Sequence, residues 1–460
     1  MWDSFHYNTL EELKQAAATV GEDLPLSENI SLLNQPLQIW QHTLPNRLAI
    51  QPMEGCDGEV DGSPGELTFR RYRRFAESGG ALIWEEATAI VPEGRANPRQ
   101  LMLTEKNLDS FRRLTDEIRE YSQRKNGFAP LLILQATHSG RYSKPQGTPA
   151  PLIAYHNPIF EQKVPIDDAR IVSDDYLKRL PEQYAKTAVL AAKAGFDGVD
   201  IKACHRYLMS ELLSAYTRPG LYGGDFENRT RLFRESLEAV KAAVPSSFGI
   251  TSRLNLYDGF PYPNGFGISP QGGLAPDLTE PIRLIEMLQK QMGIEVLDCT
   301  IGNPYFNPHV NRPFDKGPYS PPEHPLTGVA RMCHCIMTVK KAFPDLKIIS
   351  SGYSYLRQFG ANLAAGMLEQ GGADMAGFGR QAFAYPDFAE DILQKGAMNP
   401  KKCCLTCSKC TELMRAGSKA GCVLRDKDVY LPLYQRDVLK NSSRKGGKRY
   451  NVTPYKSKSE

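Results

Sequence analysis

The chain has 460 residues, 41% of them hydrophobic, which suffices for one large barrel domain with additions or for two to three ordinary domains. Its net charge of +4 is near neutral and gives no support to a nucleic-acid or membrane-surface partner. Residues 1–10 lack the order of a secretory signal, and no apolar run approaches the length of a membrane span. We therefore expect a cytoplasmic protein whose cysteines stay reduced.

After an N-terminal extension over residues 1–38, with a helix predicted at Thr9–Ala18, short apolar runs alternate with longer amphipathic stretches. The apolar runs are Arg47–Met53, Ala81–Glu86, Pro130–Gln135, Phe196–Ile201, Phe248–Leu254, Ile294–Cys299, Lys347–Ser350 and Ala373–Phe378. The amphipathic stretches include Asp174–Ala194, Asn228–Ala243, Leu278–Met292 and Gly328–Ala342. Short buried strands alternating with helices predict an α/β fold, a (β/α)8 TIM barrel over residues 39–395. An open doubly wound sheet is the alternative, and the eight repeats favour the barrel.

Two connections, Tyr257–Pro276 and Gly302–Pro325, are long and rich in glycine and proline. Both follow the carboxyl end of a predicted strand, where a barrel builds its site. Loops of this length in a compact domain are usually functional, so we expect lids over the site.

Polar or glycine residues follow most of the predicted strands. The candidate site residues are Pro52, Met53, Glu54, Gln135, Lys202, His205, Tyr207, Arg253, Ser351, Gly352, Gly379 and Arg380. The glycine-containing turns after the last two strands, together with an arginine fork, predict a phosphate site. Gln135 can both donate and accept, as a flavin pyrimidine edge requires. Arg253 would place positive charge where a reduced flavin gathers negative charge. We therefore predict non-covalent FMN.

A cysteine-rich segment, residues 396–430, follows the barrel. Cys404, Cys407, Cys410 and Cys422 place four of the ten cysteines within 19 positions. Thiolates at this density suit an iron–sulfur cluster or a tetrahedral zinc ion. Three close cysteines and one distant one favour a [4Fe–4S] cluster, with Cys403 as a neighbour and not a ligand. Residues 431–460 are basic, and we predict a flexible, solvated tail.

Several stretches resemble the Old Yellow Enzyme family, the FMN-dependent ene-reductases, and the match covers roughly residues 46–387. Its motifs are Asn46-Arg47 leading to Pro52-Met53, Gln135 to Arg141, Ala194 to Leu208, and Thr217 to Arg229. With the cysteines added, the chain resembles the subgroup of 2,4-dienoyl-CoA reductase and trimethylamine dehydrogenase. The barrels of that subgroup carry a [4Fe–4S] cluster just past the last strand.

The resemblance implies reduction of the C=C bond of an α,β-unsaturated carbonyl compound by hydride from N5 of FMN. Lys202 and His205 would hold the carbonyl oxygen, and Tyr207 would protonate the α-carbon. One departure leaves the substrate open: the family usually has histidine at position 202. Arg206 also stands where a glycine is usual.

The relatives continue into FAD- and dinucleotide-binding domains, whereas this chain contains no G-x-G-x-x-G. We therefore expect an outside electron donor, either a redox partner protein or NAD(P)H, and a small-molecule substrate. One rival is a flavin dehydrogenase oxidising an amine, with Tyr305, Phe306 and Phe314 as an aromatic bowl. The other is a non-catalytic barrel with a structural zinc module. The oligomeric state stays open, a homo-oligomer included.

Overall fold

Eight strands of the chain close into a single barrel, which confirms the predicted (β/α)8 fold. The computed structural model describes residues 4–315, 317 and 319–440. The strands are β3 (Leu48–Ile50), β4 (Leu82–Ala89), β5 (Leu131–Thr137), β6 (Gly198–Ile201), β7 (Gly249–Asn255), β8 (Val296–Thr300), β9 (Lys347–Ser350) and β10 (Met375–Phe378). All neighbouring pairs are parallel, and β10 closes on β3. Each strand overlaps its predicted apolar run.

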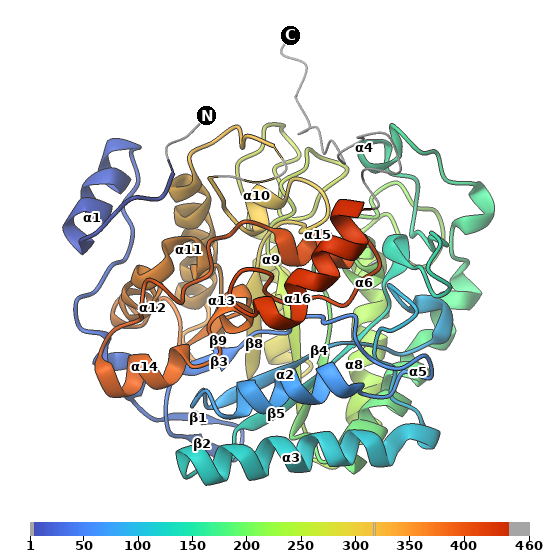
Figure 1. The fold of residues 1–460 in the computed structure, drawn as a ribbon. Helices are drawn as coiled ribbons and strands as arrows, with labels where there is room; N and C mark the ends of the chain where they lie inside the picture. The colour runs from blue at the N-terminus through green and yellow to red at the C-terminus, as the bar shows by residue number, and fades with distance from the viewer. Residues whose placement is uncertain (1–3, 316, 318, 441–460) are drawn as a thin grey trace.

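Helices cover the outside of the barrel (Figure 1). The covering helices are α2 (Glu66–Ala76), α3 (Leu108–Asn126), α5 (Asp174–Lys193), α8 (Arg231–Ala243), α9 (Thr279–Lys290), α11 (Pro325–Ala342), α12 (Gly360–Glu369) and α14 (Phe388–Lys395). The start of α5 shows how the sequence sets these bounds, because the Ser173 side chain accepts a hydrogen bond from the Tyr176 amide. The stretch predicted as one helix over residues 228–243 is divided. A short helix, α7 (Phe226–Arg229), precedes α8.

A small hairpin closes the amino-terminal end of the barrel. Its strands are β1 (Leu37–Ile39) and β2 (His42–Leu44), and both lie at the bottom of Figure 1. The Trp40 ring at its turn lies against Gly198 and Gly249, where an added Cβ would come within 2.7 and 2.2 Å of the ring. The hairpin therefore covers the amino-terminal end of the barrel with the Trp40 ring. The predicted boundary between the N-terminal extension and the barrel, at residues 38 and 39, falls inside β1.

The N-terminal extension packs onto the barrel through α12. It holds the predicted helix, α1 (Leu10–Thr19), and a 3-10 turn at Ile30–Asn34. The Ser27 amide donates to the Asn362 carbonyl oxygen over 3.0 Å. Gly366 of α12 lies so close to Pro25 that an added Cβ would be 1.9 Å from the Pro25 carbonyl oxygen. The loops of the barrel also contain three short helices, α4 (Pro158–Glu161), α6 (Leu208–Leu213) and α10 (Pro308–Asn311).

The cysteine segment folds back against the mouth of the barrel. After α13 (Arg380–Ala384) and α14, it forms α15 (Lys409–Arg415) and α16 (Lys427–Tyr434), drawn in red in Figure 1. Asp426 forms ion pairs with Arg70 and Arg74 of α2, and the Ala420 amide donates to the Gly55 carbonyl oxygen over 2.7 Å. These contacts fix the segment on the strand ends.

The end of the chain departs in part from the prediction. Of the predicted flexible tail, residues 431–434 belong to α16, and Gln435–Leu439 add one π-helical turn. Residues 441–460 lie outside the described part. No helix among the described residues combines the length and apolarity needed to cross a membrane.

Candidate active site and cysteine pocket

The predicted site residues meet in one cavity at the carboxyl end of the barrel. The space between its atoms, open mouth included, is about 1110 Å³. Its lining contains Pro52, Met53, Glu54, Gln135, Lys202, His205, Tyr207, Arg253, Ser351, Gly352, Gly379 and Arg380. Six strand ends thus contribute to one chamber. Of the two long loops, only the second reaches this lining, through residues such as Tyr305 and Arg312.

Two buried carboxylates beneath the cavity orient its polar floor. Asp200 of β6 accepts hydrogen bonds from Gln135 Nε2 at 2.7 Å and from the Arg253 amide at 2.7 Å. Because a carboxylate only accepts, the Gln135 amide nitrogen must face Asp200, which leaves Oε1 as a second hydrogen-bonding atom. Asp298 of β8 pairs with Arg253 Nε at 3.0 Å and accepts from Gln51 Nε2 at 3.1 Å. Burial raises the pKa of Asp200 to about 6 and that of Asp298 to about 7.

Glu54 places a carboxyl group in the cavity wall after β3. Its Oε1 accepts a hydrogen bond from Asn97 Nδ2 at 2.6 Å. Within the described residues it forms no ion pair within 4.0 Å. Burial raises its pKa, although Lys202 opposes that shift. Glu54 therefore lies in the wall as a buried carboxyl group whose pKa is raised.

The end of β6 carries the residues predicted to act on the substrate. His205 and Arg206 both have left-handed backbone, with φ of 63° and 60°, which turns the chain sharply at the strand end. Burial and the nearby cations, Arg253 first, hold the pKa of His205 well below its usual value, so this imidazole is neutral at pH 7. Lys202 Nζ lies 3.7 Å from the centroid of the Tyr207 ring, and burial lowers the pKa of Lys202.

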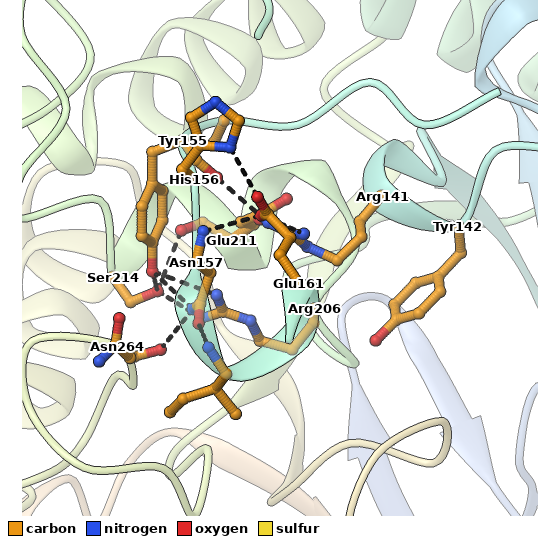
Figure 2. A network of polar contacts seen from close by, with 12 residues as sticks. Arg141, Tyr142, Tyr155, His156, Asn157, Glu161, Arg206, Glu211, Ser214 and Asn264 are labelled. Carbon is orange, nitrogen blue, oxygen red and sulfur yellow. Dashed lines mark hydrogen bonds and ion pairs between the residues drawn. The ribbon is translucent and has the colours of Figure 1, made fainter. Parts of the chain in front are cut away.

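Arg206 points away from the cavity and anchors this turn. It is fully buried, its Nη1 donates to Asp258 Oδ2 at 3.0 Å, and its Nη2 donates to the Tyr155 hydroxyl at 3.2 Å. Figure 2 shows Arg206 in a network with Tyr155 and Ser214, beside which Arg141 is held by Glu161 and Glu211. Arg206, which stands where a glycine is usual in the family, therefore stabilises the turn through buried hydrogen bonds.

Three tyrosines form one cluster at the cavity. The hydroxyl groups of Tyr207 and Tyr305 lie 2.8 Å apart, and the rings of Tyr142 and Tyr305 have centroids 4.2 Å apart. Burial, with Tyr305 as the next cause, raises the pKa of Tyr207 well above its usual value, so its hydroxyl keeps its proton. Of the three aromatics expected to form a bowl, Tyr305 lines the cavity, whereas Phe306 packs on Phe160 and Phe260.

The ends of β9 and β10 fit a phosphate group. Gly352 has a φ of 100°, and an added Cβ there would lie 2.4 Å from Met332 Sδ, so glycine is required. Arg380 begins α13, and its buried Nη1 has no hydrogen-bond partner among the described residues. An unpartnered guanidinium nitrogen beside glycine turns suits the terminal phosphate of FMN. Together with Gln135 and Arg253 at the floor, the lining therefore fits FMN.

The four predicted cysteine ligands line a second, smaller pocket. Cys404, Cys407, Cys410 and Cys422 surround about 400 Å³ of space between atoms. Cys410, Arg380 and Phe383 line both this pocket and the cavity, so the two adjoin. Cys403 does not line the pocket; its thiol instead donates to the Asn399 carbonyl oxygen over 3.3 Å. Within the described residues, no three or more side chains of His, Cys, Asp and Glu form a group that could hold a metal ion.

Arg312 connects the cavity with the cysteine segment, and the sequence reasoning did not single it out. Its Nη1 donates to Thr411 Oγ1 at 2.8 Å, and its Nη2 lies 3.4 Å from the Pro304 carbonyl oxygen. Burial first, and then the charge of Arg380, lowers the pKa of Arg312 to about 9. Tyr142 and Asn311 were also missed. Tyr142 directly follows a quoted motif residue, Arg141, which is the one signal that could have indicated it.

The barrel and its lining define a flavin-dependent oxidoreductase, and comparison with known proteins agrees. The profile of the "NADH:flavin oxidoreductase / NADH oxidase family" matches residues 32–266, and the chain belongs to this family, which implies FMN as the cofactor. An NADPH dehydrogenase of Clostridium acetobutylicum is 29% identical over 264 residues, 56% of this chain and 70% of that protein.

Two solved structures share the fold. A 2-naphthoyl-CoA reductase in complex with 2-naphthoyl-CoA has a TM-score of 0.69 and 18% identity, over 88% of this chain and 58% of that one. Histamine dehydrogenase from Rhizobium sp. 4-9 has a TM-score of 0.65 and 20% identity, over 86% of this chain and 52% of that one. The chain thus spans a little over half the length of these two proteins.

Proposed function

We propose that this oxidoreductase binds FMN in the barrel cavity and reduces the C=C bond of an α,β-unsaturated carbonyl compound. The observation that carries the proposal is the convergence of the flavin-contact residues and the β6 residues on one cavity. When bound, reduced FMN supplies the hydride that adds to the β-carbon. Lys202 and neutral His205 hold the carbonyl oxygen and stabilise the negative charge that develops there. Tyr207 donates its proton to the α-carbon, which completes the saturated product.

Charge in the cavity favours this reaction over oxidation of an amine. Lys202, Arg253, Arg312 and Arg380 line the cavity, whereas its only carboxyl group among the described residues is Glu54. Only one of the four cations, Arg253, has a carboxylate partner within 4.0 Å in the described residues. With Arg253 paired to Asp298 and Arg380 assigned to the FMN phosphate, Lys202 and Arg312 remain to stabilise a developing oxyanion and to disfavour a protonated amine.

We further propose that Cys404, Cys407, Cys410 and Cys422 hold a [4Fe–4S] cluster that passes single electrons to the flavin site. Four thiolates on one zinc ion, at about 2.3 Å each, crowd to within about 4 Å of one another. A four-iron cluster binds each thiolate at a different iron and so needs them further apart. The four cysteines share one pocket, and their spacing, three close together and one distant, supports the cluster.

The test is anaerobic purification followed by cofactor analysis and a substrate screen. We expect denatured protein to release FMN and to contain about four iron and four sulfide per chain. Conjugated enones should reoxidise the reduced flavin, and amines should leave the oxidised flavin unchanged. FAD in place of FMN, one zinc without sulfide, or reduction of the flavin by amines would each reject the corresponding part of the proposal.

A further inference from the structure

Charge is distributed unevenly along the chain. Residues 401–460 contain 15 Lys and Arg residues against 5 Asp and Glu residues, a net charge of +10, so residues 1–400 carry −6. The basic region, as we call residues 401–440, holds nine of those cations and four of those anions. One of the four, Asp426, forms its ion pairs with Arg70 and Arg74 of α2, outside the region. Positive charge is therefore concentrated on the part of the chain that carries the cysteine pocket.

The cysteine pocket can be reached from the surface. All ten cysteines belong to the described residues; the four predicted ligands are partly exposed, and the six others are buried. Lys409, Leu424 and Arg425 line the same pocket, and the last two are exposed. Because electron transfer slows steeply with distance, a protein that exchanges electrons with this pocket must approach over these residues.

Exposed apolar side chains gather on the basic region as well. Eight large hydrophobic residues are exposed in the described part of the chain, and three of them, Leu424, Leu431 and Leu439, lie within 16 residues. Leu431 belongs to α16, which meets the pocket where Lys409 Nζ lies 3.3 Å from the Tyr434 hydroxyl. In Figure 1, α16 is drawn in front of the barrel, with no other element over it. Apolar side chains among charges are typical of a protein–protein interface.

The cations beside these leucines keep their charge available for a partner. Lys409, Arg425 and Lys427 form no ion pair within 4.0 Å with any residue that the structure describes. Arg425 and Lys427 are exposed. Other cations of the region are paired, as Lys402 is with Asp387. The unpaired cations are therefore those that adjoin the pocket and the start of α16.

We propose that Lys409, Leu424, Arg425, Lys427 and Leu431 form a docking surface for an acidic protein that carries single electrons. This inference rests on the proposed cluster and names the class of its electron donor. Each docked carrier loses one electron and the cluster gains it. Two dockings thus supply the electron pair that one C=C bond consumes, and water supplies the two protons.

The chemistry of the surface fits this partner. Opposite charges speed the encounter and orient the two proteins, while the leucines supply the apolar contact. Carriers that exchange electrons bind through small interfaces, so a patch built from a few residues is sufficient. The partly exposed cysteines distinguish this surface from a basic face that is merely solvated.

The test measures binding of an acidic plant-type [2Fe–2S] ferredoxin to the anaerobically purified full chain by calorimetry. We expect Kd to rise about tenfold between about 50 and about 300 mM NaCl, because salt screens the attraction. Lys427→Glu should raise Kd about tenfold at low salt. The matched control Lys341→Glu lies in the last turn of α11, at the opposite end of the barrel, and should keep the wild-type Kd. Leu431→Gln should raise Kd about fivefold without changing the salt dependence.

Further measurements decide between this inference and the proposed reaction. Ferredoxin whose surface carboxylates have been converted to amides should not bind, and reduced native ferredoxin should reduce the flavin. Absent or salt-independent binding, equal Kd values for Lys427→Glu and wild type, or tighter binding of duplex DNA than of ferredoxin would each overturn the docking surface. Dithionite-reduced wild type mixed with an enone tests the proposed reaction without any carrier. Salt-dependent docking and flavin reduction, without reduction of any alkene, would reject that reaction and keep the surface.

Discussion

At the scale of single residues, Tyr207 is held in place by Tyr305 and Lys202. Its hydroxyl meets the Tyr305 hydroxyl at 2.8 Å, and Lys202 Nζ lies over its ring at 3.7 Å. Because burial raises the pKa of Tyr207 well above its usual value, the phenol remains protonated at neutral pH and is available as an acid. A proton donor at this position should matter for protonation and not for cofactor binding.

Tyr207→Phe should therefore keep FMN but slow reoxidation of the reduced flavin by a conjugated enone by roughly two to four orders of magnitude. Stopped-flow absorbance of the flavin measures this rate. Tyr305→Phe is the matched control, because it keeps the ring and removes only the partner hydroxyl, and its effect should be much smaller. Equal rates for wild type and Tyr207→Phe would mean that the proton comes from another group.

His138 provides a pH-dependent prediction. Its Nδ1 accepts from the Gly140 amide at 3.0 Å, and its Nε2 lies 2.8 Å from the Tyr176 hydroxyl. Burial lowers its pKa from 6.5 to about 4, so between these values the unfolded chain binds a proton that the folded chain does not. The contribution of His138 to the free energy of unfolding therefore decreases as the pH falls. From pH 7 to 5, the wild type should lose about 2 kcal/mol more than His138→Gln in urea unfolding. Parallel pH profiles for the two proteins would contradict the burial argument.

The sequence allows the cavity-lining residues to be predicted where they lie on a strand or at its end. Gln135, Arg253 and Arg380 lie in or directly after strands, and parallel strands of a closed barrel bring their carboxyl ends to one face. Arg312 lines the cavity from a loop, and Tyr142, which packs on the lining residue Tyr305, also follows a strand at a distance. The course of these segments is set by contacts with distant residues such as Thr411. No local pattern encodes those contacts, so the sequence alone did not indicate them.

At the scale of elements, the cysteine segment acts as part of the cavity wall as well as a candidate metal site. Cys410, Thr411, Met414 and Ala420 all line the cavity. The segment is attached through the ion pairs of Asp426 with α2 and through Arg312. Loss of the cluster should therefore be detectable without unfolding the barrel.

Cys407→Ser should lose iron and sulfide, whereas Cys403→Ser should keep both, because Cys403 lies outside the pocket. Iron and acid-labile sulfide analysis measures the outcome. Under anaerobic dithionite titration, wild type should accept about three electrons per chain, two by FMN and one by the cluster, and Cys407→Ser about two. Loss of iron from Cys403→Ser, or two electrons for wild type, would contradict the assignment.

The hairpin that closes the barrel leads to a stability prediction. Gly249→Ala would place a methyl group 2.2 Å from the Trp40 ring and should destabilise the fold by about 1–3 kcal/mol. Gly80→Ala is the matched control, since its nearest contact would be an ordinary 3.4 Å. Adding Trp40→Leu should recover part of the loss in Gly249→Ala, as measured by urea unfolding. No recovery in the double variant would show that the ring is not the cause.

Strands and helices were predictable for a physical reason. A barrel strand is buried on both faces, so it appears as a short continuous apolar run, and each covering helix shows the 3.6-residue period. The division of α7 from α8 was not visible, because it depends on side-chain contacts: Asp225 caps the start of α7, and at the break Thr230 Oγ1 donates to the Phe226 carbonyl oxygen. The hairpin β1–β2 was also missed, since its strands have three residues each.

At the scale of the whole molecule, the two pockets adjoin through Cys410, Arg380 and Phe383. This adjacency supports the proposed transfer of single electrons from a cluster held by the cysteines to the flavin site. Lys202 and Arg312 in the cavity lining support the proposed preference for electron-poor carbonyl compounds over amines.

The most direct test of this account is the oxidative half-reaction of the anaerobically reduced, FMN-loaded protein with a conjugated enone in D2O. We predict stoichiometric flavin reoxidation and a saturated ketone with one solvent deuterium at the α-carbon, because the Tyr207 hydroxyl that delivers this hydrogen exchanges with D2O. Unchanged flavin and recovered enone, under conditions where an amine reduces the oxidised protein, would contradict the account.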